Sequence, residues 1–168
     1  MSDFVRTEAA IRQLHSRYAD AVWRQDADAF GACFAEDAEW RVGGSVLNGR
    51  TVITEAIRAV FPNFKRILMT FRTPIVHVGD GEATSRAYVT EDRAMADGTP
   101  SLVQGVYYDR FVERGGEWLF HWRLFQTNYL GPYDMSEEFF DAPDYGAPPA
   151  MPPRDTPTVA RSATGPKN

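Results

Sequence analysis

The chain has 168 residues, of which 43% are hydrophobic and 24% charged, a composition typical of one soluble globular domain. This composition excludes global disorder, collagen-like repeats and a coiled coil. The net charge of −5 and the lack of a basic run argue against a nucleic-acid partner.

Cysteine usage and hydropathy indicate the compartment. The single cysteine, Cys33, cannot form an internal disulfide, which favours a reducing, cytoplasmic location. The first residues lack the apolar core of a signal peptide, and the chain has no run of about 18 apolar residues that could cross a membrane. We therefore expect no membrane partner.

The first part of the chain predicts helices and one short hairpin. Apolar residues recur at helical spacing over 7–23, with Thr7 as the N-cap. Asp26 is expected to cap a second, short helix. A hairpin is expected at 38–47, and a third helix follows it and stops before Pro62.

From Ile67 onward the hydrophobic period changes to two, which predicts strands. They are expected at 67–78, 83–95, 102–114 and 117–129. Tight glycine turns join these strands into an antiparallel meander, with Pro74 at a bulge or an edge. Helices segregated from an antiparallel sheet make an α+β fold, and a long sheet is expected to curve around the first helix into a cone with one open end.

The composition changes at the end of the predicted barrel. Residues 1–130 are expected to form the α+β barrel domain. Residues 131–146 are acidic with interspersed aromatics and are expected to fold over the body as a flap. Residues 147–168 are rich in proline and are expected to be disordered.

Five short motifs follow one another along the chain: YADAVWRQD at 18–26, FAEDAEW at 34–40, LNGR at 47–50, GDGEA at 79–83 and GEW at 116–118. In order and spacing they resemble the SnoaL-like branch of the nuclear-transport-factor-2-like superfamily. The resemblance covers residues 5–130. It implies a cone-shaped α+β barrel with a blind apolar pocket, in enzymes that act on steroids, polyketides, terpenes or chlorinated rings, mostly without cofactors.

The same resemblance implies an Asp–His dyad assisted by a tyrosine, and here the sequence departs from it. Tyr18 matches the tyrosine of the first helix. The position of the aspartate, five residues later, holds Trp23, and the position of the histidine falls at about Thr70. Tryptophan accepts no proton and threonine is a poor base, so the chemistry of the dyad cannot be transferred to this chain.

Three residues are candidate catalytic groups. Tyr18 could donate a hydrogen bond to an oxyanion, or be a core aromatic whose hydroxyl has a partner. Strand alternation places Glu91 near the cavity as a general acid or base; the alternatives are an ion pair with Arg123 that braces the sheet and an exposed strand end. His121 is either a base inside the cone or a core or interface histidine bonded to backbone.

Residues expected to line a ligand site share the inward faces of the predicted elements. They are Trp23, Trp40, Thr70, Val89, Val103, Tyr107, Arg123 and Phe125. By resemblance Arg123 points into the pocket, where it would orient a substrate. For the aromatic residues, a plain core role is the alternative.

Other site types are not expected. One cysteine and three scattered histidines lack metal-ligand spacing, and no glycine-rich loop precedes a helix, so we expect no metal and no cofactor. His15 and His77 are expected to be solvated, and Cys33 to be an inert core residue.

Three functions remain open. The favoured one is a pocket protein for a small apolar or polycyclic molecule, which, if it is an enzyme, acts as a cofactor-free lyase or isomerase. The alternatives are a non-catalytic ligand-binding or interaction domain, and an accessory subunit like the small subunit of ring-hydroxylating dioxygenases. Aromatic and polar residues expected on the outer sheet face, Tyr88, Thr90, Tyr108 and Trp122, predict a homodimer or a higher homo-oligomer through that face.

Overall fold

A computed structural model describes residues 3–79 and 81–139. Its helices precede the long strands: α1 (Asp3–Arg24), α2 (Ala27–Ala32), α3 (Arg50–Val60) and the short 3-10 helix η1 (Phe61–Asn63). Asp26 caps α2 as predicted, since its Oδ1 accepts a hydrogen bond of 2.9 Å from the Ala29 amide. The prediction of Thr7 as the N-cap of the first helix is wrong, because α1 begins at Asp3 and Thr7 is buried within it.

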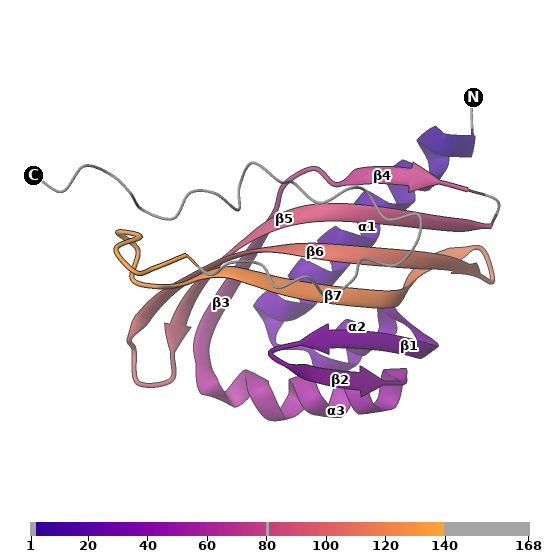
Figure 1. Ribbon diagram of the computed structural model, residues 1–168. Coiled ribbons are helices and arrows are strands. Elements are labelled where there is room, and N and C mark those ends of the chain that lie inside the picture. Colours follow the sequence, from indigo (N-terminus) through magenta and orange to yellow (C-terminus); the bar gives the residue numbers. More distant parts are fainter. Residues whose placement is uncertain (1–2, 80, 140–168) are drawn as a thin grey trace, which may run out of the picture.

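Seven strands form one sheet (Figure 1). They are β1 (Phe34–Val42), β2 (Ser45–Asn48), β3 (Phe64–Phe71), β4 (Ile75–Val78), β5 (Glu82–Met95), β6 (Pro100–Arg114) and β7 (Glu117–Gly131). Their order is β2-β1-β7-β6-β5-β3, and β4 also pairs with β5. β1 runs parallel to β7, whereas the other pairs are antiparallel. The α+β class is as predicted, with a mixed rather than purely antiparallel sheet.

The predicted strand at 67–78 is two strands. β3 and β4 both pair with β5, and the chain between them, 72–74, leaves the ladder. The Arg72 amide still donates to the Tyr88 carbonyl, at 2.9 Å. Pro74 has no amide hydrogen with which to continue the ladder, which accounts for the break.

A bulge in β7 changes which residues face inward. Arg110 pairs with Trp122 and Phe111 with Phe120, so His121 is the extra residue. Phe120 and Arg123 therefore both point into the cone. The prediction that His121 and Arg123 share a face is wrong for this reason.

The concave face of the sheet wraps α1 (Figure 1). Aromatic side chains fill the space between the sheet and α1. The Tyr18 ring lies 4.5 Å from that of Phe30 and 5.7 Å from that of Phe120. Phe34 and Trp40 of β1 join the same cluster. Burial of such large rings is the main stabilising contribution to the cone.

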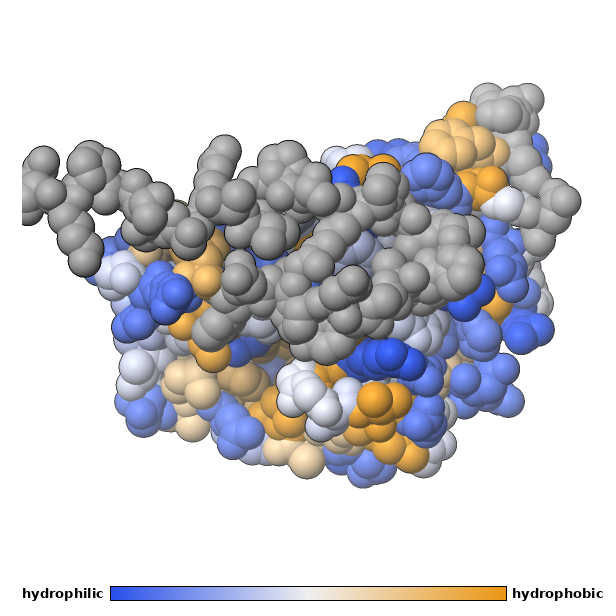
Figure 2. Space-filling model, viewed as in Figure 1, coloured by the Kyte–Doolittle hydropathy of each residue, from blue (hydrophilic) through white to orange (hydrophobic). Residues whose placement is uncertain are grey.

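The surface is mixed in character. In the view of Figure 2, apolar side chains are scattered among polar ones around β1, β2 and α3, where Val46, Val52 and Val60 are exposed. Isolated exposed apolar residues of this kind are ordinary. Within the described ranges, no helix is both long enough and apolar enough to cross a membrane.

The domain boundaries remain predictions. The last strand ends at Gly131, close to the predicted end of the barrel. Only the first residues of the predicted flap, up to Phe139, belong to the described part. The rest of the flap and the tail at 147–168 lie outside it.

Candidate functional site

The cone encloses a small cavity of about 120 Å³, called here the cone cavity. Tyr18 of α1 and Tyr107 of β6 form one side of it, and α3 supplies an apolar wall through Ile57 and Val60. The charged side chains of its lining come from β5, where Glu91 and Arg93 share the inward face. The cavity is thus mainly apolar, with hydroxyl groups and one ion pair at its edge.

Tyr18 and Tyr107 form a hydroxyl pair. Their oxygens lie 3.3 Å apart, and both rings are buried. Burial raises the pKa of Tyr18 far above its usual value, and burial likewise raises that of Tyr107; Arg123 opposes both shifts. Both hydroxyls therefore keep their protons at neutral pH. Because only one proton is shared between the two oxygens, the second can be donated to a bound molecule.

Glu91 is buried, with 3% of its surface exposed, and it pairs with Arg93. Nε of Arg93 donates to Oε2 of Glu91 at 2.9 Å, and Nη2 donates to the same oxygen. The other carboxylate oxygen, Oε1, lies outside this ion pair. The alternative of a Glu91–Arg123 pair is wrong, because the two side chains have different partners.

Arg123 lies behind the two tyrosines rather than in the lining of the cone cavity. It is fully buried, and its guanidinium carbon lies 3.7 Å from the centre of the Tyr107 ring and 4.2 Å from that of Tyr18. Its Nε forms an ion pair with Oδ1 of Asp109 at 3.1 Å. Stacking on aromatic faces stabilises the rest of the cation. Arg123 thus acts on the cavity through the tyrosine rings.

Asp109 links Arg123 to His15. The sequence analysis did not identify Asp109 or His15 as a partner of Arg123. Oδ2 of Asp109 lies 3.2 Å from Nε2 of His15, whose Nδ1 donates to the Ile11 carbonyl at 2.9 Å. The prediction that His15 is solvated is wrong, since it is buried. Both ring nitrogens are engaged, so His15 is not free to take a proton from a ligand. A signal for Asp109 existed, because it continues the inward alternation of 103, 105 and 107.

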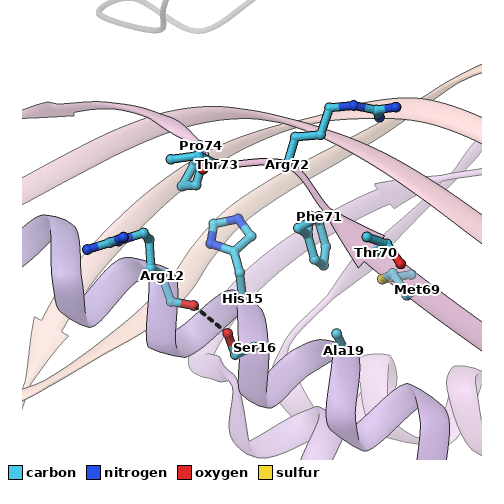
Figure 3. A pocket seen from close by; sticks show the side chains of 10 residues that line it. All are labelled: Arg12, His15, Ser16, Ala19, Met69, Thr70, Phe71, Arg72, Thr73 and Pro74. Carbon is cyan, nitrogen blue, oxygen red and sulfur yellow. Dashed lines mark hydrogen bonds between the residues drawn. The ribbon is translucent and has the colours of Figure 1, made fainter.

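A second hollow of about 400 Å³ lies between α1 and the 69–74 stretch of β3 and the link that follows it (Figure 3). Thr70 lines this hollow, although the sequence placed it in the cone. Ser16 donates to the Arg12 carbonyl at 3.1 Å, and the side chains of Arg12 and Arg72 point away from each other in Figure 3. No described residue directs an uncommitted buried polar group into this hollow, so the cone cavity is the better candidate site.

The remaining predicted site residues divide into three groups. Trp40 and Phe125 line the cone cavity, and the Phe125 ring stacks on Tyr107 at 4.6 Å. Val89 and Val103 are buried in the core without lining it. Trp23 is half-exposed on α1, outside the cavity.

His121 does not lie inside the cone. It is partly exposed at the bulge of β7, with Nε2 3.6 Å from Oδ2 of Asp37. The predictions of a base inside the cone and of a core histidine are wrong, because the bulge turns the side chain outward. The alternative of an interface histidine stays a prediction.

Clusters of metal-binding side chains and the single cysteine are two further features to place in the structure. Within the described ranges no cluster of His, Cys, Asp or Glu side chains could hold a metal ion. Cys33 is buried, and burial raises the pKa of its thiol to about 11. At neutral pH this side chain is therefore an unreactive thiol.

Comparisons with solved structures agree with this fold. A hexachlorocyclohexane dehydrochlorinase (LinA, type 2) superposes with a TM-score of 0.72 at 20% identity, over 88% of this chain and 97% of its own. A scytalone dehydratase-like protein from Novosphingobium aromaticivorans gives 0.72 at 19% identity, over 77% and 89%. The D26N variant of Rv3472 from Mycobacterium tuberculosis, a protein of unknown function, gives 0.66 at 27% identity, over 77% and 75%.

Comparisons of sequence complete the assignment. A search of curated proteins gives no match. The model of the SnoaL-like domain matches residues 3–123, which is most of the chain and nearly all of the cone. The chain therefore belongs to the SnoaL-like family.

Proposed function

We propose that the protein binds a small, mainly apolar molecule in the cone cavity and moves a proton on it without a cofactor. The observation that carries the proposal is the buried Glu91 carboxylate on the same apolar cavity as the Tyr18–Tyr107 hydroxyl pair. The hydroxyl pair would stabilise a developing oxyanion, and Glu91 would accept or return the proton. The reaction class is a lyase or an isomerase.

The size of the cavity limits the ligand. Pockets for drug-sized ligands have volumes of about 300–1,000 Å³, whereas an engineered apolar cavity of about 150 Å³ holds benzene. At about 120 Å³, the cone cavity favours a molecule with a single ring over a polycyclic one. This refines the apolar ligand expected from the sequence.

The role of each polar group depends on whether it can donate or accept a proton. The tyrosines keep theirs at neutral pH, so they can donate hydrogen bonds but cannot act as bases. Glu91 is the carboxylate in the lining, and a carboxylate is the form that accepts a proton. Arg93 fixes its orientation through Oε2.

Two relatives support the class of reaction. One is a dehydrochlorinase and the other is scytalone dehydratase-like. Dehydrochlorination and dehydration each remove a proton and a leaving group from one molecule. A base next to hydrogen-bond donors is what such eliminations need.

A non-catalytic binding protein is the second candidate. It is favoured by the departure from the family's Asp–His dyad. Trp23 and Thr70 stand at the two dyad positions, and both lie outside the cone cavity. It is also compatible with the existing Glu91–Arg93 pair, which satisfies one carboxylate oxygen without a ligand.

The test starts from a panel of small cyclic ketones and aromatic compounds, with binding measured by NMR. For each ketone that binds, exchange of its α-hydrogens in D₂O is then followed. We expect the Glu91→Gln variant to bind the ketone but no longer to exchange its α-hydrogens. The double variant Tyr18→Phe, Tyr107→Phe should exchange them more slowly. Thr70→Val, in the second hollow, is the matched control and should leave exchange unchanged.

The outcomes separate the two candidates. Exchange that survives Glu91→Gln would overturn the role of this carboxylate. Binding without any exchange in the unaltered protein would favour the binding function. Unchanged binding after Ile57→Phe, which should fill the cavity, would remove the cone cavity as the site.

A further inference from the structure

The convex, outer face of the sheet carries a second apolar cluster, here called the outer cluster. It consists of Val106, Tyr108 and Leu124, with Tyr88 and Trp122 packed against them. These residues alternate with the inward-facing ones along β5, β6 and β7. They therefore lie on the side of the sheet opposite α1.

The outer cluster is shielded from solvent although no described element covers it. Val106, Tyr108 and Leu124 expose only 4%, 6% and 5% of their surfaces. Figure 1 shows α1 on the far side of β5, β6 and β7, and the described helices make their sheet contacts there and around β1. Side chains on an uncovered convex face would be largely exposed, so the described elements do not account for this shielding.

The chain after β7 already turns onto this face. Tyr129 is paired with Gln104, which places both on the outer side. The Tyr129 hydroxyl donates to the Pro132 carbonyl at 2.7 Å, and the Phe139 ring lies 4.8 Å from the Tyr129 ring. The Gln104 amide donates to Sδ of Met135 at 3.5 Å. At Phe139, the last described residue, the chain therefore runs along the edge of the outer cluster.

The remaining segment, 140–168, has the length and the chemistry to cover the cluster. Along β7, Tyr129 and Trp122 are about 23 Å apart at ~3.3 Å per strand residue, a distance that fewer than ten extended residues span. The segment carries Phe140 and Tyr145 as apolar groups, and Asp141 and Asp144 as acids.

The charge of the face is complementary to the start of this segment, where Asp141 and Asp144 lie. Arg110 lies on the outward side of β6, and the Arg41 guanidinium lies 5.5 Å from the centre of the Trp122 ring. Arg86 lies similarly close to the Tyr88 ring, at 5.7 Å. Arg41 is already paired with Glu39, so acidic side chains approaching the outer cluster meet Arg110 and Arg86 as the cations at its rim.

We propose that residues 140–168 dock in cis on the outer cluster and occupy the face that a second copy of the chain would otherwise use. The shielding of Val106, Tyr108 and Leu124 within a single chain favours this occupant over a partner subunit. The proposal does not depend on the function of the cone cavity.

The test measures how fast a thiol reagent modifies a cysteine placed in the cluster. Leu124→Cys is made in a full-length Cys33→Ala chain, with Val46→Cys as the exposed reference and Val103→Cys as the buried one. We expect Leu124→Cys to react about tenfold or more slowly than Val46→Cys. The protection should not change over about a hundredfold range of protein concentration, because a cis contact is independent of concentration.

Changes in the tail then identify the cover. Two changes are made separately: the double substitution Phe140→Ser, Tyr145→Ser, and a chain that ends at Phe139. In each, the cysteine at position 124 should react nearly as fast as the cysteine at position 46. Val103→Cys should stay protected, which shows that the fold is intact. If the shortened chain unfolds, Val103→Cys reacts too, and the full-length Phe140→Ser, Tyr145→Ser variant decides.

Two outcomes would overturn the proposal. Protection that grows with protein concentration would assign the face to a second copy. Protection that survives both tail changes would mean that the sheet shields the cluster without the segment.

Discussion

Arg123 is a fully buried cation whose counter-charge comes from one neighbour. Asp109 lies opposite it in the β6–β7 register and is also buried. Removing one member of such a pair leaves an uncompensated charge in the core. The arrangement thus makes the interior behind Tyr18 and Tyr107 sensitive to a single substitution.

Asp109→Asn is expected to lower the free energy of unfolding by about 3–5 kcal/mol, because Arg123 loses its buried counter-charge. Urea denaturation of the variant measures the loss. The control is Asp37→Asn, which removes the partner of His121 at the surface and should cost no more than about 1 kcal/mol. Equal losses in the two variants would contradict the central place given to Asp109.

The hydroxyl pair predicts a dependence of stability on high pH. Burial raises the pKa of Tyr18 and Tyr107 above the ordinary value of 10.0. Below that value both states of the protein keep these protons. Above it, the unfolded chain releases them and the folded chain does not, so stability is lost as the pH rises past about 10.

Above pH 10, the free energy of unfolding should fall by up to about 1.4 kcal/mol per pH unit for each tyrosine. Urea midpoints between neutral pH and the alkaline range measure it. The Tyr18→Phe, Tyr107→Phe double variant should lose much less stability over that range. An identical decline in both proteins would show that other groups cause it.

At the scale of elements, close packing of β6 on β7 shapes the cone. A Cβ at Gly105 would lie 2.5 Å from the Gln126 carbonyl oxygen and 2.5 Å from the Phe125 ring. The absence of a side chain lets Phe125 stack on Tyr107 beside the cavity. Here glycine is required for close approach rather than for a turn.

Gly105→Ala is therefore expected to lower the free energy of unfolding by about 1–3 kcal/mol, since the Gln126 carbonyl oxygen cannot move aside easily. Thermal denaturation checks the loss, and the aromatic NMR signals of Phe125 should shift. Gly79→Ala is the matched control, because its nearest neighbour lies at 3.8 Å and the change should stay within about 0.5 kcal/mol. A Gly105→Ala protein as stable as this control would contradict the packing argument.

Element types could be predicted from the sequence because the hydrophobic period is local information. The three helices and the inward faces of β5 and β6 follow from it, and the Asp26 cap follows from the residue types that cap helices. The extra residue in β7 does not, because a bulge shifts the alternation by one without changing the composition. His121 was misplaced for that reason.

The candidate site could be predicted only in part. Glu91 and Tyr107 follow from alternation, and Tyr18 from the helical stripe and the family motif. The pairing of Glu91 with Arg93, and of Arg123 with Asp109, depends on which residues face each other across and along strands. Strand register is a property of the folded sheet, and the parallel pairing of β1 with β7 left no signal in the local pattern.

For the whole molecule, cavity volume sets the range of ligands. Ile57→Ala on α3 is expected to enlarge the cone cavity at a cost of about 2–3 kcal/mol. The variant should bind larger rings from the ligand panel more tightly, which calorimetry measures. Val52→Ala, at an exposed position of the same helix, is the control and should leave ligand preference unchanged. Unaltered preference in Ile57→Ala would show that α3 does not limit the cavity.

One part of the apolar wall of the cone cavity comes from an element that carries none of its proton-handling groups. α3 supplies Ile57 and Val60, whereas α1, β5 and β6 supply the hydroxyls and the carboxylate. Mutational drift in α3 can therefore alter which compounds fit without moving the reactive groups. A lineage built on this framework can acquire new ligands in single steps, and a laboratory library confined to a few α3 positions would sample the same route.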